Sequence, residues 1–232
     1  MNEFKVAWNA LLRWPLPVEN EPRDQTRVLW AMPLVGLIVG LACWLLAGLL
    51  QLLIARTLLA GLIGGVVIVF FYVWSMRGRR LKALAEAGTA WEISREKSGQ
   101  PWLQGVARLP QILCMGWLLA MTAGVFGLIV YSGTIWLIIP PVLATTALAE
   151  SSRRQSGAGE GAWQYWLVAL LIVLPVGVAL SRIAAALLGL LAAWMVGSGS
   201  VRWSWLDNQD AEPWFVIALL EAAVLWIGLL VL

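Results

Sequence analysis

Residues 31–50 read AMPLVGLIVGLACWLLAGLL, a run of 20 residues without a charged side chain. A helix of about 20 apolar residues crosses the hydrocarbon core of a lipid bilayer. The whole chain has 232 residues, of which 61% are hydrophobic and only 12% are charged. Soluble domains carry about 25% charged residues, so this chain has too little polar surface to cover a soluble core. The sequence therefore predicts an all-α polytopic membrane protein.

Further apolar runs predict about seven transmembrane helices in a single membrane domain, residues 28–232. The expected spans are 28–55, 57–75, 109–131, 134–149, 163–181, 183–199 and 213–232, with Pro140-Pro141 breaking the fourth. Residues 1–27 are expected to be a cytoplasmic segment, and 76–108 a cytoplasmic loop. Within the first of these, FKVAWNALLRW (4–14) has its apolar residues at helical spacing. This pattern is typical of an amphipathic helix that lies among lipid headgroups.

The positive charges predict which way the chain crosses the membrane. If the N-terminus is cytoplasmic, only Arg56 and Arg182 among the 16 lysines and arginines fall in outer turns. Cytoplasmic loops are enriched in Lys and Arg, so this distribution favours a cytoplasmic N-terminus. We expect a multi-pass protein of the bacterial inner membrane, whose partners are the lipid bilayer and not nucleic acid.

The composition also limits the chemistry. The chain has no histidine, which excludes Ser-His-Asp catalysis and histidine metal ligands. A metal site would need carboxylates, which favour Mg²⁺ or Ca²⁺. The two cysteines, Cys43 and Cys114, lie inside apolar runs and predict packing rather than a disulfide framework.

One acidic residue lies inside a predicted span. Glu221 is within 213–232, and an ionisable residue in a span is expensive and marks a functional site by default. Arg182 is a candidate partner, although the predicted topology places it on the outer side. The alternative is that Glu221 lies near the cytoplasmic end and is held by hydrogen bonds.

The loop stretch RGRRLKALAEAGTAWE (77–92) has two interpretations. Its strong helix formers and the i, i+4 pair of Lys82 and Glu86 are typical of an ordinary surface helix. In that case Arg77, Arg79 and Arg80 anchor the end of a span at the headgroups. The other interpretation, a substrate site, depends on a resemblance.

The order of several motifs resembles bacterial cobalamin synthases, the adenosylcobinamide-GDP ribazoletransferases. FKVAWNALLRWPLP (4–17) resembles their opening helix with its T-R-[IL]-P-[VL]-P-like turn, and 31–50 resembles their F-P-L-[IV]-G-x-x-[IL]-G span. LKALAEAGTA (81–90) aligns with their acidic motif L-D-G-L-A-D-x-x-D-G, and WEISRE (91–96) resembles L-E-I-M-R-D. Glu221 matches one of their C-terminal acids.

The acidic motif is incomplete in this chain. Glu86 stands at the second aspartate, whereas Lys82 and Thr89 replace the first and the third. The resemblance implies a reaction that joins α-ribazole, or its phosphate, to adenosylcobinamide-GDP and releases GMP with the help of Mg²⁺. A protonated lysine ligates no metal, so the altered stretch is a poor place for a divalent cation.

Two functions remain open. In the first, the protein is an active transferase that binds corrinoid and α-ribazole and uses Mg²⁺ as its cofactor. The catalytic acids would then be Glu86, Glu92, Glu96 and Glu221, and Glu86 would also ligate the metal. The residues that bind the substrate phosphate would be Lys82, Arg79 and Arg80. The loss of the motif favours the second function, a catalytically silent relative that acts as a membrane scaffold or complex subunit. A transporter is a weaker third class, because no inverted repeat is visible.

Overall fold

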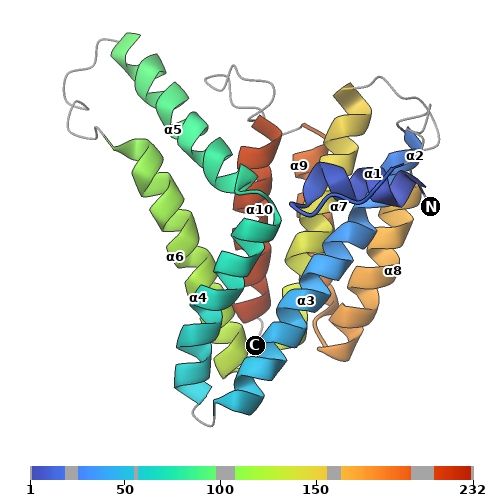
Figure 1. Cartoon of the computed structure of the whole chain (residues 1–232), viewed down its shortest axis with the longest axis vertical. Helices are drawn as coiled ribbons and strands as arrows, with labels where there is room; N and C mark the ends of the chain where they lie inside the picture. The colour runs from blue at the N-terminus through green and yellow to red at the C-terminus, as the bar shows by residue number, and fades with distance from the viewer. Residues whose placement is uncertain are drawn as a thin grey trace.

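The computed structural model in Figure 1 is a bundle of helices. It describes residues 2–18, 26–54, 57–97, 108–155, 163–199 and 212–230, and within these ranges the chain forms helices and no strands. The all-α prediction is confirmed for this part of the chain.

Five helical segments are long and apolar enough to cross a membrane. They are α3 (Met32–Leu53), α4 (Thr57–Ser75), α6 (Leu109–Val130), the segment Thr134–Arg154 and most of α10 (Glu212–Leu230). Two further apolar helices, α8 (Gln164–Ala179) and α9 (Ile183–Gly197), have only 16 and 15 residues. A typical span needs at least about 17 residues. The helices thus support the transmembrane character of the protein.

The predicted spans match helices, with two differences. The first predicted span, 28–55, is divided, because the short helix α2 (Thr26–Leu29) ends in a turn before α3 begins. The fourth, 134–149, starts as the 3₁₀ helix η2 (Thr134–Ile138) and continues as α7 (Ile139–Gln155). Pro140 and Pro141 lie in the first turn of α7, where a missing N–H breaks no helical hydrogen bond, so they start the helix rather than interrupt it.

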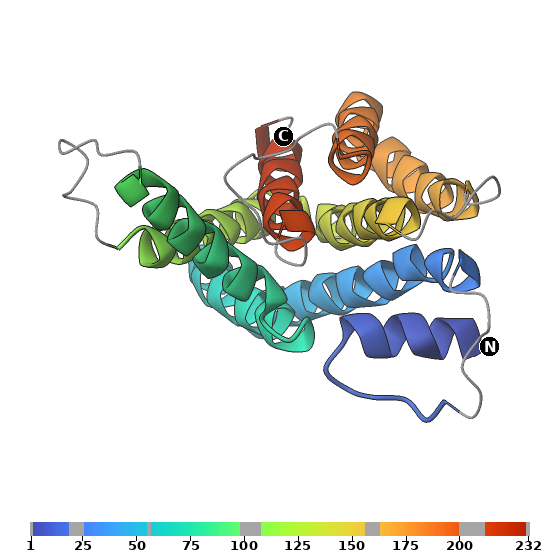
Figure 2. The same ribbon diagram turned by 90° about the horizontal axis from the view of Figure 1, so that it is seen from above.

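The segment η2–α7 is the centre of the bundle. Every residue from 136 to 150 is buried, and α7 packs against α3, α8, α9 and α10. Figure 2 shows α7 with α3 on one side, α8 and α9 on the other, and α10 next to it. The other long helices face outward with many large apolar side chains exposed, among them Leu62, Val66 and Phe70 of α4. Such a surface suits contact with lipid tails.

Two glycines allow α3 to approach this central segment closely. A Cβ at Gly36 would lie 2.6 Å from the carbonyl oxygen of Pro141, and one at Gly40 would lie 2.7 Å from the Cα of Ile138. The spacing of four residues places both glycines on one face of α3. Small residues at this spacing are a common device for close helix packing in membranes.

The N-terminal helix α1 (Asn2–Leu11) lies across the long helices instead of along them (Figure 1). Ala7 and Leu11 are buried against the bundle. Within α1, the Asn9 side chain donates to the carbonyl of Leu16, which follows the helix, at 2.8 Å and accepts from the N–H of Leu16 at 2.6 Å. The amphipathic helix predicted at 4–14 is therefore present with slightly earlier bounds.

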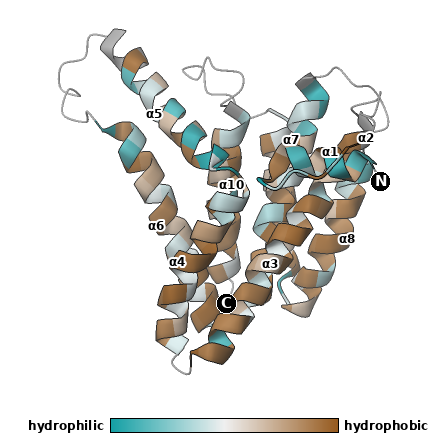
Figure 3. Cartoon of the chain, viewed as in Figure 1, coloured by the Kyte–Doolittle hydropathy of each residue, from teal (hydrophilic) through white to brown (hydrophobic). Residues whose placement is uncertain are grey.

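Most hydrophilic residues gather at one end of the bundle. Figure 3 shows them on α1, on α5 (Arg79–Lys97) and at the end of α7, whereas the rest of the long helices is largely hydrophobic. The whole of α5 falls in the loop predicted at 76–108, and it leans away from the bundle along its length (Figure 1).

Candidate functional site

A buried ionic cluster joins α4, α5 and α10, and it consists of Tyr72, Arg80 and Glu221. Tyr72 lies near the end of α4 and Glu221 in the middle of α10. Arg77 and Gly78, with φ of 59° and 63°, turn the chain between α4 and α5. Arg80 is the second residue of α5 after this turn, and its side chain lies inside the bundle beside α10.

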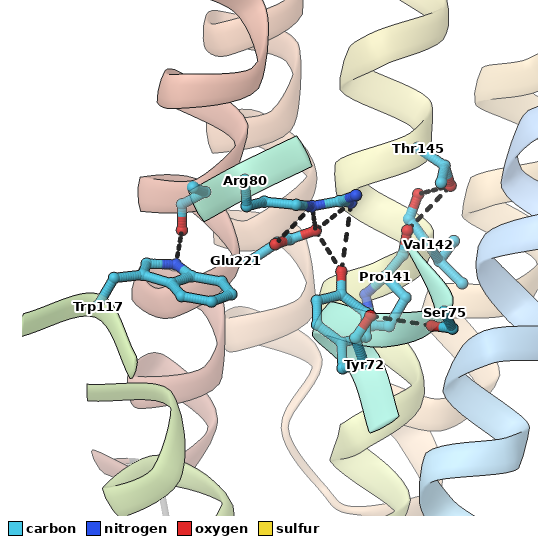
Figure 4. Close-up of polar contacts among 9 residues, drawn as sticks. Tyr72, Ser75, Arg80, Trp117, Pro141, Val142, Thr145 and Glu221 are labelled. Atoms are coloured by element: carbon cyan, nitrogen blue, oxygen red, sulfur yellow. Dashed lines mark hydrogen bonds and ion pairs between the residues drawn. The ribbon is translucent and has the colours of Figure 1, made fainter. Parts of the chain in front are cut away.

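The geometry is that of a closed ion pair. Nε of Arg80 donates to both carboxylate oxygens of Glu221 at 3.2 Å, and Nη2 donates to Oε1 at 2.7 Å. The hydroxyl of Tyr72 donates to the same oxygen and accepts from Nη2 of Arg80 at 3.4 Å. Figure 4 shows the three side chains converging on one another. The exposed fractions of the Arg80 and Glu221 side chains are 3% and 0%, so water does not screen the pair.

Aromatic rings complete the surroundings of Arg80. Its guanidinium carbon lies 5.1 Å from the ring centroid of Trp214 and 5.5 Å from that of Tyr72. Nη1 is buried without a hydrogen-bond partner in the described part of the chain, and these π-systems are its electrostatic neighbours. Burial alone lowers the pKa of Arg80, but the carboxylate of Glu221 more than offsets this and raises the pKa overall. Arg80 is therefore charged.

Comparisons of the chain with protein-family models, with curated proteins and with solved structures find no match.

The sequence contains a signal for the buried position of Arg80. Within residues 79–93 of α5, where burial is described, the buried residues are Arg80, Ala83, Leu84, Ala87 and Gly88. Their spacing of i, i+3, i+4, i+7 and i+8 is that of one helix face. Arg80 thus lies on the apolar face of α5, not among the surface arginines expected to anchor a span.

Of the acids predicted in the loop, Glu86 and Glu92 have described side chains, and neither joins the cluster. Lys82 and Glu86 form an i, i+4 pair at 3.6 Å with exposed fractions of 78% and 37%, as the surface-helix interpretation predicts. Glu92 accepts a hydrogen bond at 2.8 Å from the N–H of Leu109, the first residue of α6. A carboxylate at the N-terminus of a helix accepts a hydrogen bond from an otherwise free N–H and interacts favourably with the helix dipole. The side chain of Glu96 lies outside the described residues.

Arg79, predicted to bind phosphate, contacts the protein instead. Its Nη1 donates to the carbonyl of Ala10 near the end of α1. Its guanidinium carbon lies 5.2 Å from the ring centroid of Trp214. Burial and the positive charges of Arg77 and Arg80 lower its pKa.

Arg182 is not the partner of Glu221. Its Nη1 donates at 2.7 Å to the carbonyl of Gly228 in the last turn of α10. The side chain also lies over the ring of Trp136 at 6.0 Å. A cation at this place complements the negative end of the helix dipole.

A second buried acid, Glu150, was not singled out in the sequence. It accepts hydrogen bonds from Arg153 at 2.7 Å, Arg154 at 3.2 Å, Trp166 at 3.2 Å and the hydroxyl of Tyr165. The i, i+3 and i, i+4 spacing of the arginines could have indicated part of this network. Because Tyr165 and Trp166 belong to α8, the network joins the end of α7 to α8.

These carboxylates do not fit a Mg²⁺ site. Among the described residues, no group of three acidic or cysteine side chains could hold a metal ion. Glu221 is neutralised by Arg80, Glu92 binds the start of α6, and Glu86 lies beside a lysine. Mg²⁺ binds through one or two free carboxylates together with waters and phosphates, whereas each of these three carboxylates already faces a cation or an N–H donor.

Proposed function

We propose that the protein is a divergent, catalytically silent relative of the cobalamin synthases that acts as a membrane scaffold or complex subunit. The observation that carries the proposal is the closed pairing of Glu221 with Arg80 and Tyr72. Glu221 is the acid that both its position in a span and the resemblance mark as functional. In this structure its carboxylate oxygens face protein donors and contribute to joining α4, α5 and α10.

The proposal includes seven spans, a cytoplasmic N-terminus and location in a bacterial inner membrane. In favour of seven, α8 begins at the end of the bundle where α7 finishes, and α10 begins at that end again (Figure 1). The chain returns between them through α9. Membranes thin locally around short apolar helices, so 15 or 16 residues suffice at a modest cost. The basic residues of α5 and those in the last turn of α7, Arg153 and Arg154, lie at the end of the bundle that carries α1 (Figure 1), which supports a cytoplasmic N-terminus because cytoplasmic loops are enriched in Lys and Arg.

Complementation tests the functional proposal. The chain is expressed in a bacterium that lacks its own cobalamin synthase, supplied with cobinamide and the lower base, and scored for cobalamin-dependent growth. We expect no growth although immunoblots find the protein in the membrane, because the carboxylates needed for Mg²⁺ are occupied or separated. A synthase with the complete acidic motif is the positive control.

Growth with the native chain would overturn the silent-relative proposal. A Glu86→Ala variant would then separate two explanations. Loss of growth in this variant would assign Glu86, the remaining acid of the motif at 81–90, to the transferase reaction. Retained growth would show that the activity needs no acid at that position.

A further inference from the structure

A pocket of about 530 Å³ lies where α4 ends and the segment after α1 crosses it. Its lining residues are Arg13, Phe70, Val73, Trp74, Arg77 and Gly78. Phe70 and Trp74 are 70% and 40% exposed, so the pocket opens to the outside of the bundle. Neither arginine takes part in the buried ionic cluster.

The backbone fixes both arginines at this pocket. The N–H of Gly78 donates to the carbonyl of Val73 at 2.9 Å, and that of Arg77 donates to the carbonyl of Trp74 at 3.2 Å. These bonds close the end of α4 as a Schellman motif, in which position C′ is usually glycine. Arg77 occupies C′ with φ of 59°, a conformation that disfavours a residue with a Cβ. The chain thus has an arginine at a position whose backbone conformation favours glycine.

Arg13 reaches the pocket from the other side. Its N–H donates to the carbonyl of Ser75 at 2.9 Å, which ties the segment after α1 to the end of α4. The guanidinium carbon lies 5.5 Å from the ring centroid of Trp74. Trp14 packs edge-on against the same ring with the centroids 4.9 Å apart. The guanidinium of Arg13 is therefore positioned by Trp74, which is itself packed against Trp14.

The pocket combines positive charge with an apolar wall. Two of its six lining residues are arginines and none is acidic. Guanidinium groups bind phosphate oxygens in bidentate fashion. Below the pocket, Phe70, Val66 and Leu62 follow one another at intervals of four residues, and each is more than half exposed. They form an apolar stripe that runs from the pocket down α4.

We propose that this pocket binds one anionic phospholipid. Arg13 and Arg77 bind its phosphate, and an acyl chain lies along Phe70, Val66 and Leu62. The position suits this ligand, because the pocket is at the end of an apolar helix, beside tryptophans and an amphipathic helix, where headgroups lie. An inorganic phosphate would leave the apolar part of the pocket unused. The proposal does not depend on whether the protein is a transferase or a scaffold.

Native mass spectrometry of the full chain in detergent tests the site. The delipidated protein is titrated with dioleoylphosphatidylglycerol and, separately, with dioleoylphosphatidylcholine. The test variants are Arg77→Gly, which keeps the left-handed backbone, and Arg13→Gln, which keeps the backbone N–H that Ser75 accepts. Arg108→Gln removes an exposed charge at the start of α6 and is the matched control.

We expect one phosphatidylglycerol to bind more tightly than phosphatidylcholine. Each test variant should weaken this first binding event about fivefold, because each arginine near a headgroup contributes on the order of a kilocalorie per mole. Arg108→Gln should bind like the native chain. The proposal is overturned if Arg77→Gly and Arg13→Gln bind phosphatidylglycerol as the native chain does, or if both lipids bind equally. Displacement of the lipid by excess inorganic phosphate would also overturn it, since the site would then recognise phosphate alone.

Discussion

Replacement of Glu221 by alanine is expected to lower the free energy of unfolding by about 3–5 kcal/mol, because it leaves Arg80 charged, buried and without its partner. The two side chains are almost completely shielded from solvent. Tyr72 would lose its acceptor in the same change. The measurement is unfolding of the purified protein in mixed micelles by titration with sodium dodecyl sulfate.

Glu86→Ala is the matched control for this change. It removes a carboxylate in the same way, but from a glutamate whose side chain is 37% exposed and pairs with the exposed Lys82. Exposed pairs contribute little, so the stability should change by no more than about 0.5 kcal/mol. Equal stability of Glu221→Ala and Glu86→Ala would refute the assignment of Glu221 to a structural ion pair.

Gly40→Ala is expected to lower the free energy of unfolding by about 1–3 kcal/mol through overpacking between α3 and η2. The added Cβ would lie 2.7 Å from the Cα and 2.8 Å from the carbonyl oxygen of Ile138. Both are backbone atoms, so relief requires movement of the central segment rather than rotation of a side chain. The same micellar unfolding assay measures the change.

Gly48→Ala, on the same helix, is the control for Gly40→Ala. Nothing lies within 4 Å of a Cβ at Gly48. Alanine favours a helix over glycine by about 0.5–1 kcal/mol, so this variant should be as stable as the native chain or more so. If both variants changed stability in the same way, the close approach of α3 to η2 would not be the cause.

The sequence predicts most of the fold because the length of an apolar run is a local property. The span predicted at 57–75 coincides with α4, and that at 109–131 ends one residue beyond α6. The predicted span 28–55 is divided in the structure for a local reason too, because hydropathy does not register the turn between α2 and α3. The effect of Pro140-Pro141 depends on where α7 begins, which tertiary packing decides.

The candidate site was only half predictable. Glu221 stands out in the sequence because a charge inside a span is costly. Its partner Arg80 is 141 residues away and belongs to a basic stretch that is typical of a membrane-surface anchor. The helical spacing of Arg80 with Ala83, Leu84 and Ala87 could have indicated burial, but only the packing of α5 against α10 reveals which acid it meets.

A double-mutant cycle tests whether the ion pair of Arg80 and Glu221 holds α5 and α10 together. The cycle compares Arg80→Met, Glu221→Leu and the double variant by micellar unfolding. Each single change leaves a buried charge and should cost about 3–5 kcal/mol, whereas the double variant should cost less than either single change, since apolar side chains of similar volume replace a buried pair well. If the free energy of unfolding of the double variant instead falls by the sum of the two single effects, the two side chains act independently and do not form a structural ion pair.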